Sequence, residues 1–532
     1  MSQVKDRRWY KAYHSNIPRE IEIPEVSVYT FLENSAKNFG KRTAIIQDSE
    51  RISYHQLKEW TEKLAGAFHR LGLKKGDRIG LMISNRPSYI ISYYAAMKLG
   101  LIVVQINPRY TTRELLQIVN DSEPRLMIVE GDAVSSIKKL VDFFPLEYIL
   151  VVDSEDTEYK HLEDILQSAE PFNEVIEIDA KEDVAVIQYT GGTTGTIKGA
   201  MLTHYNLVAN VYQSHGMYGD EMKFGEEMVL TAIPLYHVYG MTVAMNLGIY
   251  IGATLLLVNK FEVKPVLEMI EEYKATFFPA VPRMYNSIVN YQGVENFSLK
   301  SLKFCTSGSA PLPVEVIRKF ERLTGAVIGE GYGLTECSPS THRNPYFWKR
   351  KIGSIGIPFQ NTDCKIIGED NVELPIGSIG ELIIKGPQVM KGYWRNEEET
   401  RNVLKDGWLY TGDLAKQDED GYFYIVGRKK EMIINGGFNV YPQEIENVLY
   451  EHPDIHECAV VGIPDIEKGE VVKAYLVAKE GRTIDLEDIK GFCYRNLTPY
   501  KVPEAFEVID ELPRNTVGKI LKRVLIDKEI KQ

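Results

Sequence analysis

Residues 189–199 have the composition of a loop that binds phosphate. The stretch reads Tyr-Thr-Gly-Gly-Thr-Thr-Gly-Thr-Ile-Lys-Gly. Its glycines let the backbone turn tightly and approach an anion, its threonine hydroxyls can donate hydrogen bonds, and Lys198 adds a mobile positive charge. The apolar run 184–189 before the loop predicts a buried strand, and residues 200–210 after it predict a helix. A strand, a glycine-rich loop and a helix in this order favour a phosphate cradle.

This loop does not follow the Walker pattern, because no Lys-Ser or Lys-Thr pair follows the glycines at the required spacing. A flexible surface loop rich in glycine and threonine is the alternative interpretation of the same residues. The choice between these two interpretations therefore depends on the other chemical groups of the chain.

A second cluster, Gly331-Tyr332-Gly333-Leu334-Thr335-Glu336, follows the apolar run 326–328. The ring of Tyr332 can stack on a nucleobase, the hydroxyl of Thr335 can bond a phosphate, and the carboxylate of Glu336 can help to hold Mg²⁺. Three more groups lie later in the chain: Asp413 in Tyr-Thr-Gly-Asp, Arg428 after Gly427, and Lys519 on a turn near the C-terminus. Taken singly, each of these three could be an ordinary surface charge.

The composition excludes several classes of protein. The chain has 532 residues, of which 44% are hydrophobic and 26% charged, and its formal net charge is −12. Such a length predicts about three to four structural units, and the acidic balance gives no global attraction to nucleic acid or to an anionic membrane. The five scattered cysteines favour a reducing compartment and no structural metal site. The polar, basic start, 1–13, predicts no secretory signal and hence a cytoplasmic protein.

One uncharged stretch of nineteen residues, 240–258, approaches the length of a membrane span. Asn246, Gly248 and Gly252 interrupt it. We expect a helix followed by a short buried strand at 253–258, with a membrane span as the alternative.

Short apolar strands alternate with amphipathic helices over most of the chain, for example at 78–83, 101–105 and 126–129. This alternation predicts parallel sheets covered by helices. From about residue 353 the strands become more polar and turn-rich, as at 363–367 and 380–384, which predicts a small antiparallel or barrel-like unit. After the charged junction 427–430, strands at 458–462 and 471–477 and a helix at 442–450 predict an α+β unit.

The predicted fold is therefore α/β. We expect a large N-terminal domain of helix-covered sheets with a small barrel-like unit, residues 1–428, and a small, mobile α+β domain, residues 429–532.

Together and in this order, the five motifs resemble those of the AMP-forming acyl-CoA synthetase family, within the superfamily of acyl- and aryl-CoA ligases, peptide-synthetase adenylation domains and luciferases. The resemblance spans almost the whole chain. It is strongest to the fatty-acyl-CoA ligases, because residues 436–446, Gly-Gly-Phe-Asn-Val-Tyr-Pro-Gln-Glu-Ile-Glu, and 234–237, Pro-Leu-Tyr-His, are typical of that group.

The resemblance implies a nucleotide site. The ATP phosphates would be wrapped by Thr190, Gly191, Gly192, Thr193, Thr194, Gly195, Thr196 and Lys198. Adenine would be held by Gly308, Ser309 and Ala310 together with Tyr332, and Gly333 would also belong to the cofactor-binding site. The ribose would be held by Asp413 and Arg428. Thr335 would bond the α-phosphate, Glu336 would bind Mg²⁺, and Lys519 would reach in from the C-terminal domain.

The resemblance also implies an acyl site, a hinge and a thiol channel. His237 and Tyr236 would lie at the mouth of the acyl pocket, although a packing or gating role suits His237 at least as well as a chemical one. Lys430 would be the pivot of the C-terminal domain, and Gly436 and Gly437 would flank the pantetheine tunnel. Gly436 departs from the serine that is more frequent in fatty-acyl relatives, which leaves the contacts of that tunnel open.

The implied reaction joins a medium- or long-chain fatty acid to coenzyme A through an acyl-adenylate, with ATP, Mg²⁺ and coenzyme A as cofactors. Ligation of an aryl acid and loading of a carrier-protein thiol are the enzymatic alternatives. A non-catalytic nucleotide or acyl-CoA sensor is disfavoured, because it has no need of Lys519, Glu336 and Asp413 together. The expected partners are small molecules, with no nucleic acid and no transmembrane segment. Peripheral membrane contact, and a monomer or a homodimer, are all compatible with the sequence.

Overall fold

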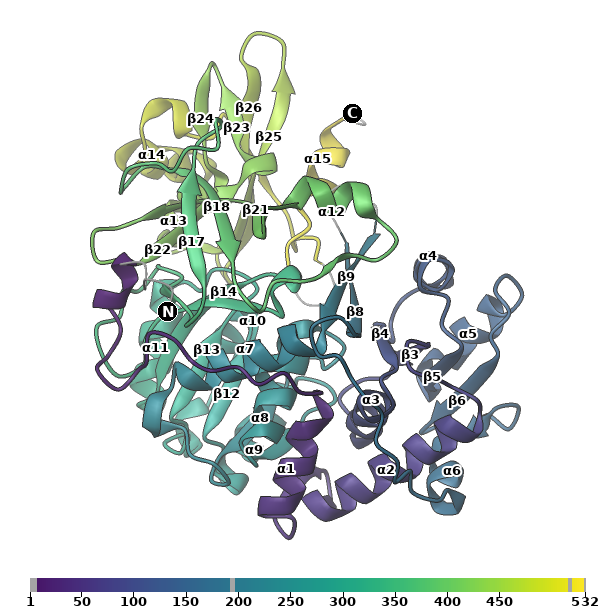
Figure 1. Cartoon of the computed structure of the whole chain (residues 1–532). Helices are drawn as coiled ribbons and strands as arrows, with labels where there is room; N and C mark the ends of the chain where they lie inside the picture. The colour runs from purple at the N-terminus through teal and green to yellow at the C-terminus, as the bar shows by residue number, and fades with distance from the viewer. Residues whose placement is uncertain (1–6, 192–196, 515–518, 531–532) are drawn as a thin grey trace.

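Two large sheets form the lower part of the molecule in Figure 1, and a smaller antiparallel sheet and the C-terminal sheet lie above them. The computed structural model of the chain describes residues 7–191, 197–514 and 519–530. The predicted phosphate-binding residues Gly192, Thr193, Thr194, Gly195 and Thr196 therefore lie outside the described residues.

The eight-stranded sheet has the order β19-β9-β8-β4-β3-β5-β6-β7, and β8, β4, β3, β5, β6 and β7 run parallel to one another. Its strands are β3 (Arg78–Met82), β4 (Ile102–Gln105), β5 (Leu126–Glu130), β6 (Tyr148–Val152), β7 (Lys160–His161), β8 (Val184–Gly191), β9 (Ile197–Thr203) and β19 (Gly392–Tyr393). The helices in this part of the chain are α2 (Tyr54–Arg70), α3 (Pro87–Leu99), α4 (Thr112–Ser122), α5 (Val134–Leu140) and α6 (Leu162–Ser168).

The nine-stranded sheet has the order β16-β15-β14-β13-β12-β10-β11-β1-β2 and is parallel from β14 to β1. Its strands are β1 (Thr43–Gln47), β2 (Glu50–Ser53), β10 (Met228–Thr231), β11 (Thr254–Leu257), β12 (Phe277–Ala280), β13 (Phe304–Ser307), β14 (Val327–Gly333), β15 (Ser340–Arg343) and β16 (Ile357–Pro358). Further helices of the large N-terminal part are α1 (Tyr29–Phe39), α7 (His204–Gly216), α8 (Leu247–Tyr250), α9 (Val263–Tyr273), α10 (Pro282–Val289) and α11 (Val314–Thr324).

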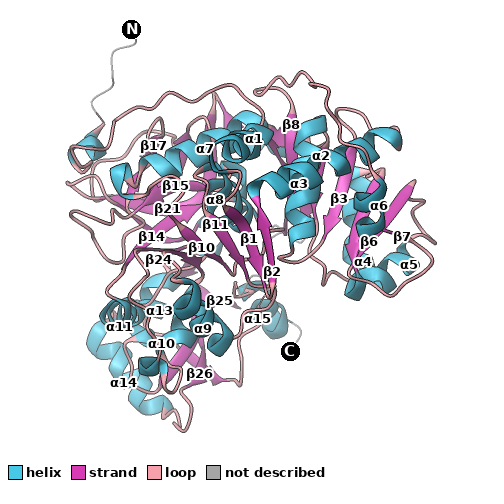
Figure 2. Cartoon of the chain, turned by 90° about the horizontal axis from the view of Figure 1, so that it is seen from below, coloured by secondary structure: helices cyan, strands magenta, loops and turns pink. Residues whose placement is uncertain are grey.

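The main core lies between these two sheets. Helix α3 is apolar on all sides and lies between them, as Figure 2 shows, so Tyr89, Tyr93 and Tyr94 are fully buried. Asn246 completes this core by bonding the hydroxyls of both Tyr93 and Tyr94, at 3.1 and 3.0 Å. A buried amide whose nitrogen and oxygen are both hydrogen-bonded is tolerated in an apolar core.

The two smaller sheets follow the order of the chain. The antiparallel unit contains β17 (Asp363–Ile367), β18 (Gly380–Lys385), β20 (Leu404–Lys405), β21 (Trp408–Gln417), β22 (Phe423–Arg428) and the helix α12 (Glu397–Val403). The last sheet contains β23 (Ile433–Asn435), β24 (Phe438–Val440), β25 (Ile455–Asp465), β26 (Gly469–Ala478) and β27 (Ala505–Val508), packed against α13 (Pro442–Tyr450), α14 (Leu486–Asn496) and α15 (Lys522–Ile530).

This architecture confirms the α/β fold with a large N-terminal part and a small C-terminal part. Helix α13 has the bounds that the sequence predicts, 442–450. The division at residues 428 and 429 stays a prediction, since the structure gives the sheets but no movement between them.

The prediction of a helix directly after the glycine-rich loop is wrong. Residues 197–203 form β9, which pairs antiparallel with β8, and α7 begins only at His204. The helix starts there because Thr203 and Asn206 form a capping box: the Thr203 hydroxyl accepts from the Asn206 backbone N–H, and the Asn206 side chain accepts from that of Thr203. The loop thus joins two strands of a hairpin.

The uncharged stretch 240–258 contains the π-helix η4 (Gly240–Asn246), α8 and the buried strand β11, which agrees with the predicted helix and strand. In the part of the chain that the structure describes, no helix has both the length and the apolar character needed to cross a bilayer.

Candidate functional site

The buried carboxylate of Asp413 contacts two other residues singled out from the sequence, Arg428 and Tyr332. Asp413 on β21 lies opposite Arg428 on β22, and the Arg428 Nε is 2.8 Å from the Asp413 Oδ1. The Tyr332 hydroxyl, from β14 of the nine-stranded sheet, donates to the Asp413 Oδ2 at 2.5 Å. Asp413 is 3% exposed. Burial raises the pKa of Asp413, and Arg428 opposes that shift by stabilising the charged form.

Lys519 brings a positive charge from the C-terminal part of the chain into this cluster. Its pKa is lowered by burial first and then by repulsion from Arg428, while Asp413, Glu431 and Glu336 act in the opposite direction. Lys519 therefore shares one electrostatic environment with Asp413, Arg428 and Glu336, although it is more than a hundred residues from Asp413 along the chain.

His237 lies beside the same lysine. Burial lowers the pKa of His237 to about 4, and Lys519 contributes to the shift. Its Nδ1 accepts a hydrogen bond from the Tyr239 backbone N–H at 3.2 Å. The imidazole is thus neutral at pH 7, which supports a packing or gating role. Tyr236 lies next to it, and its carbonyl accepts from the Gln188 side chain at 3.3 Å.

Glu336 is linked to strand β9 through Tyr393, a residue that was not predicted from the sequence. The Tyr393 hydroxyl donates to the Glu336 Oε1 at 2.8 Å. Tyr393 on β19 pairs with Ala200 of β9, and the Lys198 Nζ lies 5.5 Å from the Tyr393 ring centroid and 2.7 Å from the Glu399 Oε2. Thr190 lies opposite Lys198 on β8. No local signal links Tyr393 to residues two hundred positions earlier; only strand pairing does.

Residues 308–310, predicted to hold adenine, follow β13, which is the parallel neighbour of the strand that carries Tyr332 and Gly333. Ser309 has a positive φ of 73°. Tyr239 forms the adjacent wall, because its hydroxyl donates to the Thr306 carbonyl at 3.0 Å and its ring would be 3.4 Å from a Cβ placed on Gly308. Thr335 begins the short helix η6 (Thr335–Cys337), which also contains Glu336.

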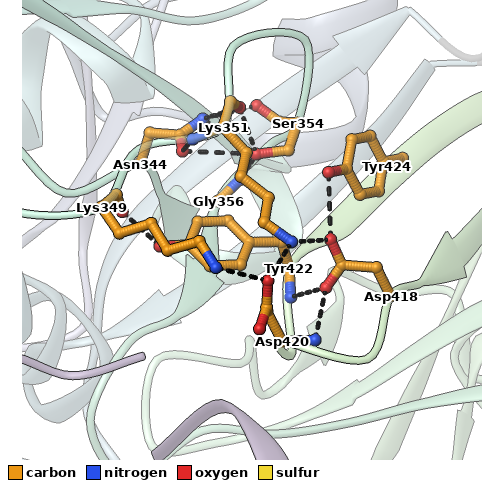
Figure 3. A network of polar contacts seen from close by, with 9 residues as sticks. All are labelled: Asn344, Lys349, Lys351, Ser354, Gly356, Asp418, Asp420, Tyr422 and Tyr424. Carbon is orange, nitrogen blue, oxygen red and sulfur yellow. Dashed lines mark hydrogen bonds and ion pairs between the residues drawn. The ribbon is translucent and has the colours of Figure 1, made fainter. Parts of the chain in front are cut away.

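A network of polar contacts holds the hairpin that carries Asp413 and Arg428 (Figure 3). The Lys351 ammonium pairs with Asp418 and Asp420 at 2.5 and 2.6 Å, and Tyr424 donates to Asp418 at 3.1 Å. Hydrogen bonds from Lys349 and Lys351 lower the pKa of Asp420 to about 2. The loop after β15 is thereby fixed to the turn between β21 and β22.

Two predicted features lie away from this cluster. Gly436 and Gly437 form the exposed turn between β23 and β24, with φ values of 57° and 84° that favour glycine. Lys430 is exposed on the short helix η7 (Lys429–Glu431), next to Lys429, which pairs with Glu381 at 2.9 Å. The tunnel and hinge roles of these residues stay predictions.

The donors at Glu336 fit a magnesium ion that is held mostly by phosphate oxygens and water. Among the described residues no group of three or more His, Cys, Asp or Glu side chains could hold a metal ion by itself. Mg²⁺ characteristically binds through one or two carboxylates plus substrate phosphates. Glu336 has one oxygen bonded to Tyr393 and can offer the other to such an ion.

Comparison with known proteins agrees with this arrangement. Residues 32–394 match the family described as AMP-binding enzyme, and residues 444–519 match the AMP-binding enzyme C-terminal domain. The long-chain-fatty-acid–CoA ligase of Bacillus subtilis is 42% identical over 98% of both chains.

Two solved proteins share the fold over most of their length. ATP-bound MatB from Rhodopseudomonas palustris has a TM-score of 0.87 at 31% identity over 94% of this chain and 98% of that one, whereas its apo structure has a TM-score of 0.77. The anthranilate CoA ligase AuaEII in complex with anthranoyl-AMP has a TM-score of 0.89 at 26% identity, covering 95% of this chain and 98% of that one. The chain belongs to the AMP-binding enzyme family, whose two characteristic domains it carries in order.

Proposed function

We propose that this protein is an AMP-forming fatty-acyl-CoA ligase. The observation that carries the proposal is the meeting of Lys519, from the C-terminal part, with Asp413, Arg428 and Glu336 of the N-terminal part. A carboxylate is a poor acyl donor, so it has to be activated before a thiol can attack it. A site that gathers cations, a ribose-binding carboxylate and a phosphate-binding hairpin is suited to that activation.

In the first step, a carboxylate oxygen of the acid attacks the α-phosphorus of ATP, a new P–O bond forms, and the bond to pyrophosphate breaks. Both reactants are anions, so fixed positive charge and alignment lower the barrier. Lys519 would lie between the carboxylate and the α-phosphate, Thr335 would bond the α-phosphate, and Thr190 and Lys198 would hold the departing phosphates. Asp413 and Arg428 would fix the ribose. Mg²⁺, held by Glu336, would neutralise phosphate charge when bound.

In the second step, the thiol of coenzyme A attacks the acyl carbonyl, AMP leaves, and the thiol proton passes to solvent. No covalent enzyme intermediate is required. The second step needs a thiol channel beside the same carbonyl, and we propose that rotation of residues 429–532 about Lys430 removes Lys519 and brings in Gly436 and Gly437.

The orientation in the structure supports assignment to the first step. Lys519 lies at the nucleotide cluster and the Gly436–Gly437 turn is exposed. The agreement with ATP-bound MatB is better than with its apo form at the same identity.

A medium- or long-chain fatty acid is the proposed substrate, because the relative at 42% identity is named for long-chain fatty acids. The neighbours of His237 in the chain are in keeping with an apolar acid, since Val238, Tyr239 and Met241 are buried. A cytoplasmic location is part of the proposal, supported by five buried cysteines without a disulfide. A monomer or a homodimer remains the expected state.

The test is a panel of acids assayed for pyrophosphate release and for thioester formation. The panel should contain saturated acids of increasing length and aryl acids, each with coenzyme A or a carrier protein as acceptor. We expect the highest kcat/KM with a fatty acid and coenzyme A. Preference for an aryl acid, or for the carrier thiol, would replace the proposal by the corresponding alternative.

A further inference from the structure

A half-buried lysine, Lys522, joins the segment that carries Lys519 to the start of the C-terminal part. Its Nζ lies 2.8 Å from the Glu446 Oε1 on α13 and 3.6 Å from the Glu431 Oε2 on η7. The side chains of Lys522 and Glu446 are 15% and 8% exposed, and that of Glu431 is 28% exposed. Glu446 is further fixed because its Oε1 accepts from the Val460 backbone N–H at 2.8 Å.

Lys522 stays charged in this position. Burial alone would lower its pKa, but Glu446 and Glu431 outweigh that cost, and the pKa of Lys522 is raised. A half-buried cation between two carboxylates is costly to separate from them, because removing one partner leaves charge that is less well compensated.

The three-residue step from Lys519 to Lys522 makes this contact relevant to the site. The base of the segment is closed by a bridge between Arg514 and Ile520 and by the Leu521 N–H, which donates to the Pro513 carbonyl at 2.8 Å. The Arg514 guanidinium pairs with Glu457 at 2.6 Å. Lys522 directly follows Leu521 in this closed segment, so its ion pair connects the segment to Glu431, the residue that follows Lys430.

Glu431 faces two positively charged partners at once. It pairs with Lys522, and it is one of the carboxylates that raise the pKa of Lys519 against burial and Arg428. Arg428, Asp413, Glu431 and Glu336 are among the charged groups that act on Lys519, and Lys519 in turn lowers the pKa of His237.

We propose that Glu431 is a positioning residue for the adenylation step, which acts through Lys522 to hold the Lys519 segment in a fixed relation to residue 430. A rotation at residue 430 would then carry Lys519 with it as one body. This inference rests on the proposed function and adds to it a residue that neither the motifs nor the comparisons assign.

The test uses Glu431→Gln, Lys522→Met and the double variant, with Lys522→Arg as the conservative replacement. Lys528→Met is the matched control, because Lys528 is on the same helix α15 and pairs with Glu507 at 2.5 Å on an exposed face. Two rates are measured with the full chain: acid-dependent pyrophosphate release, and thioester formation from synthetic acyl-adenylate. Melting temperatures are recorded for each variant.

We expect Glu431→Gln and Lys522→Met each to slow adenylation by about tenfold, below the roughly hundredfold that a 1 Å misplacement can cost. Thioester formation should be unchanged, Lys522→Arg should restore most of the adenylation rate, and Lys528→Met should resemble the wild type. The double variant should be no slower than the worse single variant, because both changes break the same contact.

The pH profile separates positioning at the site from a purely structural role. The Glu431 carboxylate raises the pKa of Lys519, so Glu431→Gln should move the alkaline limb of the adenylation rate to lower pH. Should Lys522→Met fail to fold, Glu431→Gln still decides, because its side chain is partly exposed.

The inference would be overturned if Glu431→Gln kept the wild-type adenylation rate or left the alkaline limb where it is in the wild type. It would also be overturned if the variants lost both half-reactions equally, or if the losses in the double variant were additive. Failure of the proposed function has a different signature, since the wild-type chain would then release no pyrophosphate with any acid.

Discussion

Replacing Asp413 by asparagine removes the charge at the centre of the site while keeping its shape. Asp413 accepts from the Tyr332 hydroxyl at 2.5 Å and pairs with the Arg428 Nε at 2.8 Å. An asparagine has one acceptor oxygen, so its NH₂ group must face either the tyrosine hydroxyl or the guanidinium. In either orientation Arg428 loses its anionic partner, and the predicted contact with the ribose is weakened.

The size of the effect follows from the burial of the two partners. Removing one member of a fully buried ion pair costs about 3–5 kcal/mol. The Arg428 side chain is 35% exposed and stays partly solvated, so we expect a loss of about 1–3 kcal/mol in stability. Loss of the charge-assisted bonds to the ribose should cost about 1.5–3 kcal/mol of transition-state binding, or roughly ten- to hundredfold in kcat/KM for ATP.

The assay is acid-dependent pyrophosphate release at varied ATP, with a melting curve for each protein. Asp370→Asn is the control, because Asp370 is an exposed turn residue of the same antiparallel unit and its carboxylate accepts from the Val372 N–H at 3.1 Å. We expect a raised KM for ATP in Asp413→Asn only. An Asp413→Asn protein that folds normally and keeps its kcat/KM for ATP would refute the ribose-binding role.

Four further predictions test the other parts of the site. Lys519→Ala should cut acyl-adenylate formation by on the order of a hundredfold, as loss of one preorganised charge does, and should spare thioester formation from acyl-adenylate; equal losses in both steps would contradict the two-state scheme. Glu336→Gln should raise the Mg²⁺ concentration for half-maximal rate without lowering the melting temperature, and an unchanged Mg²⁺ dependence would make the carboxylate an ordinary loop acid. Lys430→Pro should keep adenylation but abolish overall ligation, because proline fixes φ at the proposed pivot, whereas Lys430→Ala should be mild; full ligation by the proline variant would end the hinge hypothesis. Burial lowers the pKa of His204 to about 4 and of His342 to about 3, so the folded chain keeps both neutral while the unfolded chain protonates them below about 6.5. The free energy of unfolding should therefore fall from pH 6.5 towards 4, by about 4 kcal/mol for the pair at pH 5. A flat melting temperature between pH 7 and 5 would argue against this prediction.

The sequence predicted those parts of the molecule that local pattern determines. The bounds of α13 and the alternation of strands and helices follow from hydrophobic periodicity. The motif residues Tyr332, Asp413 and Arg428 were proposed for one nucleotide, and the structure brings them into contact.

The parts that depend on distant pairing were missed. Residues 197–203, Ile-Lys-Gly-Ala-Met-Leu-Thr, can form a helix or a strand, and pairing with β8 and β19 decides for a strand. Tyr393 has no motif of its own, and it reaches Glu336 only because β19 lies beside β9. The contact of Glu431 with Lys522 also joins residues ninety positions apart that no local spacing relates.

The central claim is that the acid is activated as an acyl-adenylate at this site, and oxygen transfer tests it most directly. The acid is supplied with ¹⁸O in both carboxylate positions, together with ATP, Mg²⁺ and coenzyme A, and the products are analysed by mass spectrometry. Attack of a carboxylate oxygen on the α-phosphorus predicts one ¹⁸O in AMP, one in the acyl-CoA and none in pyrophosphate. Label in free phosphate with ADP as the nucleotide product, or unlabelled AMP, would contradict the account.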